Sequence, residues 1–279
     1  MEVTAHAASV DITGDSDVDR SLLVRDAQEG ISETFEREFS CISADDAKLR
    51  LHAYKIRYDV YCVERKYEDP EKNVAGLETD EFDSHSPHKL LLHRRSGRFA
   101  GVVRLILPLG RDGAHRLSFM RHADENLIAG TAFPASHTAE VSRFAITRQF
   151  RDGLRSPPDG SIRNEVRSGS TTLLCHLSIG LMRAVVELAA EHNMTHLCAV
   201  MEPALLRLLS RLGVHFQALG PKIDHHGWRQ PCFADLDRLL ARTWAERRDI
   251  WEILTHRGRV WPVSFQRSQS PMCRALIPE

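Results

Sequence analysis

The chain has 279 residues, of which 42% are hydrophobic and 27% are charged, and its net charge is −1. This is the composition of a globular protein with a full hydrophobic core, and it excludes a strong overall bias toward nucleic acid. No run approaches the ~18 apolar residues of a membrane span, and the N-terminus lacks the basic and then apolar order of a signal peptide, so we expect a cytoplasmic location.

The six cysteines and fifteen histidines show no metal-binding spacing. There is no CxxC pair, and the close histidine pairs, His85/His88 and His225/His226, have no cysteine or helical HxxxH beside them. We therefore expect reduced, largely buried thiols and no metal site.

The N-terminal part predicts a tail followed by a helix. Residues 1–33 are polar, acidic and aperiodic, which is typical of a disordered tail, and 34–279 are expected to form one domain with a C-terminal helical extension. Apolar residues at three- and four-residue spacing predict a helix over 43–63, capped by Ser43. The proline-containing segment 69–73 predicts a loop after it.

A β-hairpin is predicted next. Residues 88–93 and 99–107 are strand-like and flank a turn at 94–98. A further strand is expected over 140–147, and residues 148–168 are loop-like.

The second half alternates helices and strands. Pro203 is expected to open one of these helices and Gly213 to close it. In chain order the pattern predicts a helix over 170–192, a strand over 196–201, a helix over 203–213, a strand over 214–219 and a helix over 235–254. Hairpins followed by alternation predict one mixed sheet with helices on its faces, an α/β (α+β) architecture.

Charged residues interrupt the strand-like segments of the first half at three places. The segments are Glu78–Asp83, with the sequence ETDEFD, the apolar run around Arg104, and Glu140–Phe144, with the sequence EVSRF. Charge is costly to bury unless it is paired or used. Three such interruptions predict a functional site.

The order of these motifs resembles the acyl-homoserine-lactone (autoinducer) synthases and the related long-chain N-acyl amino acid synthases. The resemblance covers roughly residues 45–240, and within this range the segment 201–216 is similar to a helix and closing strand of the family. Segments 220–227 and 231–233 are similar to acyltransferases associated with bacterial PEP-CTERM/exosortase systems. These families share the GNAT fold, so the resemblance implies a GNAT-like three-layer αβα sandwich with a mixed, mostly antiparallel central sheet.

The resemblance implies an N-acyltransferase without a bound cofactor. It would move a long-chain fatty acyl group from acyl carrier protein or acyl-CoA to the amine of an amino acid or similar small acceptor. One alternative is an autoinducer synthase that uses S-adenosylmethionine, but Tyr61 and Tyr67 stand where that family generally has phenylalanine and then tryptophan. An alternative of another class is a catalytically silent module that senses acyl carriers or acts as a scaffold. The lipid product could also bring the protein into peripheral contact with a membrane.

Glu140 is the candidate general base, because a carboxylate can take the proton that the acceptor ammonium must lose. It could instead be a buried partner for Arg143 or Arg104. Ser142 could assist at the thioester or simply pack in the core. In a regular strand, residues 140 and 143 point to opposite faces, so a bulge or two distinct roles are required if Arg143 shares the site.

Asp80 and Asp83 are expected to bind the acceptor's ammonium and to orient Arg57, or else to lie in a solvated loop. Arginines could hold these acids or grip an acceptor carboxylate. The full set of expected substrate-binding residues is Arg57, Tyr61, Glu78, Asp80, Asp83, Arg104 and Phe144.

Residues 143–167 contain six arginines and three acidic residues. Such a basic patch suits an acyl carrier protein, which has an acidic surface and carries a phosphopantetheine group. Arg148, Arg151 and Arg155 are therefore candidate carrier-binding residues. The alternative is a solvated loop without a function. Cys175 and Cys198 lack the adjacent histidine and acid of a nucleophile, which favours direct acyl transfer.

Overall fold

The computed structural model describes residues 31–73, 75–109, 117, 119, 134–152 and 165–261. In these residues eight strands form a sheet of order β1-β2-β3-β4-β5-β8-β6, with β7 paired to β8 outside this path. All neighbouring strands are antiparallel except β4 and β5, which are parallel. The strands are β1 (Phe39–Ser43), β2 (His88–His93), β3 (Arg98–Ile106), β4 (Thr138–Ile146), β5 (His196–Met201), β6 (Gln217–Ala218), β7 (Ile223–Asp224) and β8 (Trp228–Asp235).

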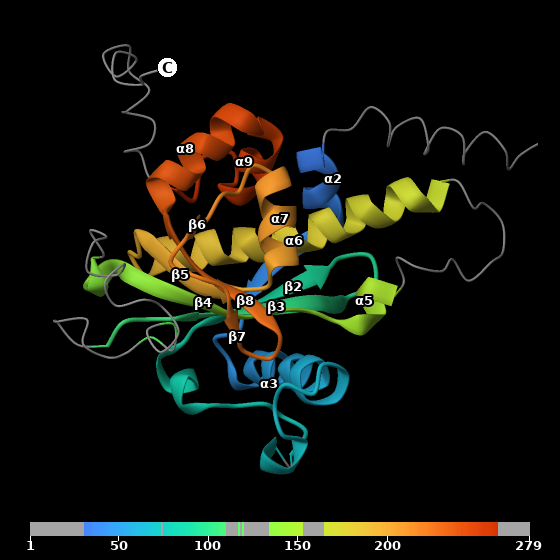
Figure 1. Cartoon of the computed structure of the whole chain (residues 1–279). Helices are drawn as coiled ribbons and strands as arrows, with labels where there is room; N and C mark the ends of the chain where they lie inside the picture. Colours follow the sequence, from blue (N-terminus) through green and yellow to red (C-terminus); the bar gives the residue numbers. More distant parts are fainter. Residues whose placement is uncertain are drawn as a thin grey trace, which may run out of the picture.

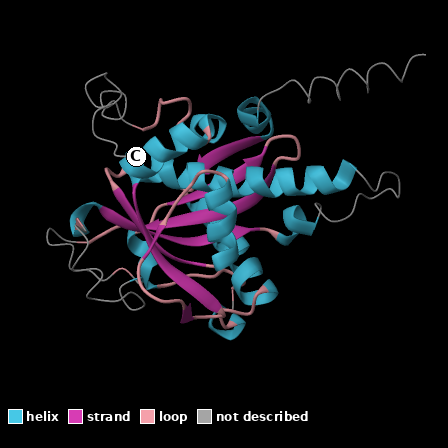
Figure 2. Cartoon of the chain, turned by 45° about the horizontal axis from the view of Figure 1, so that its top comes forward, coloured by secondary structure: helices cyan, strands magenta, loops and turns pink. Residues whose placement is uncertain are grey.

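Helices cover both faces of this sheet, as Figures 1 and 2 show. The long α6 and the helices α2, α7, α8 and α9 lie on one face, and α3 lies on the other with the π-helix that continues it. This arrangement confirms the predicted αβα sandwich. The α-helices are α2 (Ile31–Glu38), α3 (Ala47–Arg57), α5 (Arg148–Asp152), α6 (Glu165–Glu191), α7 (Pro203–Arg211), α8 (Leu236–Glu246) and α9 (Arg248–Leu254), and the π-helix is Tyr58–Glu64. Short 3₁₀ helices are Pro70–Asn73, Glu81–His85 and Ala135–His137.

The alternation of side chains in β3 divides the core into two layers. Val103 and Leu105 pack in the large cluster that contains the buried face of α6. Val102 packs in the smaller cluster with Ala53 and Ile56 of α3. Because successive strand residues point to opposite faces, Arg104 lies on the α3 side of the sheet.

Two of the predicted boundaries in the first part are wrong, the end of the tail and the start of the first helix. Residues 31–33 begin helix α2 and are not tail, because Phe35 of this short helix is fully buried in the main core. Ser43 ends the unpredicted strand β1. Helix α3 starts four residues later, where the Asp46 carboxylate accepts a hydrogen bond of 2.8 Å from the Leu49 N–H. Residues 1–30 of the predicted tail lie outside the described residues.

The second half also departs from the prediction. Residues 148–152 form the short helix α5 instead of loop, and the strand expected over 214–219 is reduced to β6. The helix expected over 235–254 is two helices, because Arg247 between them has an extended φ of −145°. Strand β8 was not predicted, since Pro231 is atypical of an inner strand. No helix in the described ranges is long and apolar enough to cross a membrane.

Candidate active site

The two parallel strands in the middle of the sheet pair over only a short stretch. Their register runs from Thr138 opposite His196 to Glu140 opposite Cys198. Both strands continue beyond this point, β4 to Ile146 and β5 to Met201. Backbone amides and carbonyls of the continuing strands are therefore not used by the ladder between β4 and β5. Glu140 stands where the pairing ends.

A β-bulge follows directly in β4. Opposite this strand, Val102 pairs with Ala145 and Arg104 pairs with Ser142, so β4 has one residue more than β3 in this interval. Arg143 has a φ of +50°, which is uncommon for a residue with a side chain and typical of a bulge position.

The bulge shifts the side-chain alternation of β4 by one residue. Before the bulge Ala139 and Val141 pack in the α6 cluster, and after it Phe144 and Ile146 do so. Arg143, inside the bulge, reaches the carboxylates on the α3 side. The bulge therefore answers the spacing problem raised by residues 140 and 143, because both can serve the same face of the sheet.

Arg57, the last residue of α3, lies at the bottom of an ion-pair network. Its side chain is fully buried. The Nε atom donates to Glu78 Oε2 at 2.5 Å, and Nη1 and Nη2 donate to the two oxygens of Asp83 at 2.6 and 3.1 Å. Nη1 also contacts His88 Nε2 at 2.8 Å. Since arginine has no acceptor atom, His88 accepts here through an unprotonated nitrogen.

Arg104 connects this network to the central strand. Its Nε donates to Ser142 Oγ at 2.9 Å. Its Nη1 donates to Asp80 Oδ1 at 2.5 Å and to Asp83 Oδ1 at 2.8 Å. Because Ser142 accepts in this bond, its own hydroxyl hydrogen remains available for another acceptor.

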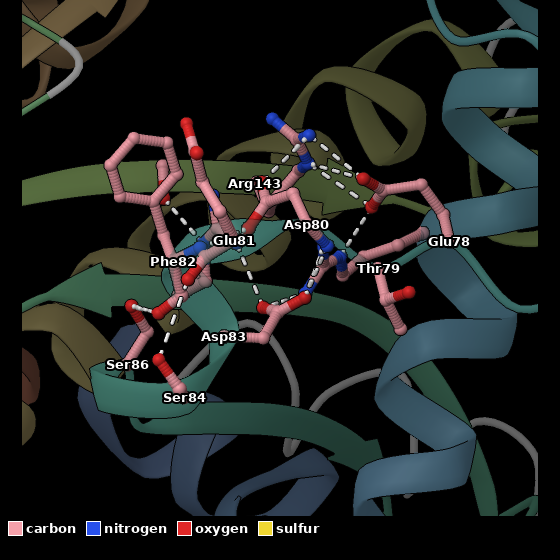
Figure 3. Close-up of polar contacts among 12 residues, drawn as sticks. Glu78, Thr79, Asp80, Glu81, Phe82, Asp83, Ser84, Ser86 and Arg143 are labelled. Atoms are coloured by element: carbon pink, nitrogen blue, oxygen red, sulfur yellow. Dashed lines mark hydrogen bonds and ion pairs between the residues drawn. The ribbon is translucent and has the colours of Figure 1, made fainter. Parts of the chain in front are cut away.

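Arg143 completes the network from the bulge. Its Nη2 donates to Glu78 Oε1 at 2.8 Å, to Glu68 at 3.1 Å and to Asp80 Oδ2 at 3.2 Å, and Nε also bonds Glu78. The guanidinium carbon lies 5.1 Å from the centre of the Tyr61 ring. Figure 3 shows Arg143 directed at Glu78 and at the loop that carries the acids.

The loop that carries the acids is held by its own hydrogen bonds. Asp80 caps the 3₁₀ helix Glu81–His85 by accepting from the Phe82 N–H, and Asp83 accepts from the Asp80 N–H at 2.8 Å, which closes a capping box (Figure 3). The Glu78 N–H donates to the Tyr54 carbonyl of α3. Each of the three carboxylates therefore has both oxygens bonded, and they fix the position of the arginines.

The protonation states follow from these contacts. Burial alone would raise the pKa of Glu78, but hydrogen bonds from Arg143 and Arg57 outweigh it and lower the pKa to about 2. Burial alone would also raise the pKa of Asp83, but hydrogen bonds from Arg57 and the positive charge of Arg104 hold it well below its usual range. Burial lowers the pKa of His88. Both acids are ionised at neutral pH. With Asp80 and Glu68, the network has four carboxylates around three arginines.

Glu140 is separate from the acid loop. Its side chain is buried, with 4% exposure, and Oε2 accepts a hydrogen bond of 2.9 Å from the Phe119 N–H. Cys198 stands opposite it on β5. Burial and then the negative charge of Glu140 raise the pKa of the Cys198 thiol well above its usual value. A thiol held protonated is a poor nucleophile, in agreement with direct transfer.

The structure brings most of the expected residues together but not all. Arg57, Tyr61, Glu78, Asp80, Asp83, Arg104, Ser142 and Arg143 form one contact network, and their roles in binding or catalysis stay predictions. Phe144 packs against the main core on the α6 side. Arg148 is exposed on α5, and Arg151 is ion-paired with Glu64 of the π-helix. Arg155 lies outside the described residues.

Sequence reasoning missed two members of the network. His88 opens the predicted strand 88–93 and pairs directly with Arg104 across the hairpin, so the register of that hairpin was the available signal. Glu68 lies in the loop after the π-helix, and no local pattern indicates that it reaches Arg143. Among the described residues, no group of three or more His, Cys, Asp or Glu side chains is arranged to hold a metal ion.

Comparisons with known proteins agree with this architecture. A family model described as an acetyltransferase (GNAT) domain matches residues 56–155. An acyl-homoserine-lactone synthase of Vibrio anguillarum is 25% identical over 171 residues, which are 61% of this chain and 76% of that protein.

Solved structures give the same result for the fold. A CoA-dependent acyl-homoserine lactone synthase, BjaI, solved with SAM and isopentyl-CoA, matches with a TM-score of 0.50 and 22% identity over 79% of this chain and 88% of that chain. TofI, solved in a ternary complex with an inhibitor and MTA, matches with a TM-score of 0.50 and 23% identity over 75% of this chain and 95% of that chain. The predicted GNAT-like fold and the relation to acyl-homoserine-lactone synthases are confirmed, and the exosortase link stays a prediction.

Proposed function

We propose that this protein is an N-acyltransferase that moves a fatty acyl group from a thioester to the amine of an amino acid or similar small acceptor. The observation that carries the proposal is the end of the β4–β5 ladder at Glu140, on the same face of the sheet as Ser142 and the bulged Arg143. A buried carboxylate, a hydroxyl and a bonded guanidinium then line the place where two strands stop pairing.

The acyl donor is a thioester of phosphopantetheine, carried by acyl carrier protein or by coenzyme A. The pantetheine arm contains two amides, which can pair with strand backbone that has no ladder partner. The segments of β4 and β5 beyond Glu140 and Cys198 offer such backbone. Arg148 and Arg151 lie on α5, directly after β4, and in this proposal they face the carrier. Arg151 has its charge partly balanced by Glu64.

The reaction is direct attack with general-base assistance. Glu140 takes a proton from the acceptor ammonium, directly or through a water, and the free amine attacks the thioester carbon. A C–N bond forms and the C–S bond breaks, and the departing thiolate takes up the second proton that the attacking nitrogen loses as it becomes an amide. Attack makes the thioester carbonyl oxygen an oxyanion. The Ser142 hydroxyl, whose oxygen already accepts from Arg104, donates a hydrogen bond to this oxyanion. Such general-base help is worth roughly 10²–10⁴ in rate.

The test is the Glu140→Gln variant in a purified acyl-transfer assay, with products identified by mass spectrometry. We expect kcat to fall by about 10²–10⁴ while the melting temperature is retained, because glutamine keeps the shape and can still accept from the Phe119 N–H. Glu33→Gln, at an exposed position in the first turn of α2 on the other face of the sheet, serves as the control. Full activity in a folded Glu140→Gln protein would refute the general-base role.

The relative from Vibrio anguillarum favours a second candidate, an acyl-homoserine-lactone synthase that uses S-adenosylmethionine. The same assay distinguishes the two when both acceptors are supplied. N-acyl amino acids support the proposal, and lactones with methylthioadenosine support the alternative. A folded protein that forms neither product would be a catalytically silent module.

A further inference from the structure

Resting on the proposed function, we propose that Arg229 binds the carboxylate of the acceptor, so that the substrate is an amino acid and not a simple amine. Arg229 lies in the β7–β8 hairpin, far in sequence from the motifs of the candidate active site. Its position follows from sheet register, from the contacts of the hairpin turn and from the hydrogen-bonding capacity of its guanidinium.

The register places Arg229 on the same face of the sheet as Glu140. In the β5–β8 pair, Cys198 stands opposite Phe233 and Val200 opposite Pro231. Cys198, Phe233 and Val200 pack in one cluster on the α3 side. Side chains two residues further along each strand keep this face.

Continuing this alternation by two residues brings Arg229 opposite Glu202, which is the residue after β5. The contact is present, with Arg229 Nη2 3.3 Å from Glu202 Oε1. Arg143 of β4 and Arg229 of β8 therefore flank the diverging ends of β4 and β5 from two sides.

Two tyrosines connect these flanks. Tyr61 lies under the Arg143 guanidinium at 5.1 Å, and the rings of Tyr61 and Tyr67 are 6.4 Å apart. The Arg229 guanidinium lies 5.4 Å from the centre of the Tyr67 ring. Tyr61 of the π-helix and Tyr67 of the loop after it therefore form a chain of ring contacts from Arg143 to Arg229.

The hairpin turn fixes this arrangement. His226 has a φ of +54° and Gly227 a φ of +89°, and a left-handed conformation at a residue with a side chain costs about 1–2 kcal/mol. The His226 ring stacks on Tyr67 with centroids 5.1 Å apart and planes at 26°. The strained turn therefore brings the hairpin against the aromatic pair, with Arg229 at its base.

Arg229 has fewer acidic partners than the arginines of the network. Arg57 and Arg104 each pair with two carboxylates and Arg143 pairs with three. Arg229 is 12% exposed, its Nη1 donates to the Trp228 carbonyl at 3.1 Å, and Glu202 is its acidic partner among the described residues. No described group accepts from its Nε. A guanidinium edge of this kind matches a carboxylate in a bidentate contact.

The experiment compares one change in the protein with one change in the substrate. Acyl transfer is measured with an amino acid and with its decarboxylated amine, for the wild type, Arg229→Gln and the control Arg238→Gln, whose side chain is 90% exposed on α8. Because hydrogen bonds to charged groups are worth more than neutral ones, we expect Arg229→Gln to lower kcat/KM for the amino acid by about 10–100-fold. The value for the amine should change by less than about twofold, and Arg238→Gln should match the wild type.

Arg229→Lys separates binding from hairpin stability, because it keeps the charge but not the bidentate edge. It should recover part of the preference for the amino acid, with a melting temperature equal to that of the wild type. Equal losses for amino acid and amine in Arg229→Gln, or a wild type that uses both substrates equally well, would overturn the assignment of Arg229. Product from neither substrate would overturn the proposed function and this inference with it.

Discussion

The Glu78→Gln variant tests whether the ion pairs between the acid loop, residues 78–83, and the three arginines Arg57, Arg104 and Arg143 stabilise the fold. We call this network the brace. Glu78 is 1% exposed and accepts from Arg57 Nε and from Nε and Nη2 of Arg143. A glutamine in its place offers one acceptor oxygen and adds two donors, so one guanidinium hydrogen bond at least is lost and the buried Arg57 loses a charge partner. Breaking a buried ion pair from one side costs about 3–5 kcal/mol.

The pKa of Glu78 gives an independent magnitude. A pKa of about 2 in the folded protein against the ordinary 4.5 corresponds to about 3 kcal/mol of stability. Because the folded pKa is depressed, this contribution is complete above pH 4.5 and disappears as the pH falls toward 2. The difference in unfolding free energy between wild type and variant should therefore be constant from pH 7 to 5.5.

Urea unfolding followed by tryptophan fluorescence measures this difference at several pH values. We expect about 3 kcal/mol at pH 7, decreasing by about 1 kcal/mol between pH 5.5 and 3.5. Asp59→Asn is the matched control, since its partner Lys55 is also largely exposed and such a pair contributes at most about 1 kcal/mol. A difference below about 1 kcal/mol at pH 7 for Glu78→Gln, or one that does not change with pH, would refute the brace.

Two further substitutions address the mechanism and the core. Cys198→Ala should retain acyl transfer within about tenfold, because direct attack needs no acyl-cysteine; complete loss of product from a folded variant would contradict this. Gly180→Ala in α6 should lower the unfolding free energy by about 1–3 kcal/mol through overpacking, because a Cβ there would lie 2.8 and 2.9 Å from the Leu91 methyls and 3.0 Å from the Phe35 ring. An unchanged urea midpoint would show that α6 shifts to make room.

The sequence predicts the elements whose patterns are long and regular. The hairpin of β2 and β3, the strand β5 and the helix α7 lie close to their expected positions, because turn residues and a proline mark their ends. The short helix α2 gives too few residues for a periodic pattern, and β8 contains Pro231 and polar residues, so it does not read as an inner strand. These elements form because tertiary packing overrides weak local signals.

The charged residues that interrupt the strand-like segments were the sequence feature that best predicted the site. Arg57, the acid loop, Arg104 and Arg143 converge because charge in buried strands must find a partner. The spacing of residues 140 and 143 offered a bulge as one of two alternatives but could not decide between them, since a positive φ at arginine has no sequence signature. The separation of Glu140 from the acid loop depends on long-range pairing of β4 with β5, which local pattern does not contain.

The charge balance of the brace also bears on how an acceptor is recognised. The brace holds three arginines and, with Glu68, four carboxylates, which bond one another and leave no excess of positive charge for the carboxylate of a zwitterion. Recognition in the proposed arrangement must then come from groups outside the brace, with Glu140 drawing the ammonium to the end of the β4–β5 ladder and Arg229 holding the carboxylate on the β8 side. An amine without a carboxylate lacks the second contact, so its amine nitrogen is less well oriented for attack, and orientation is a large part of catalysis.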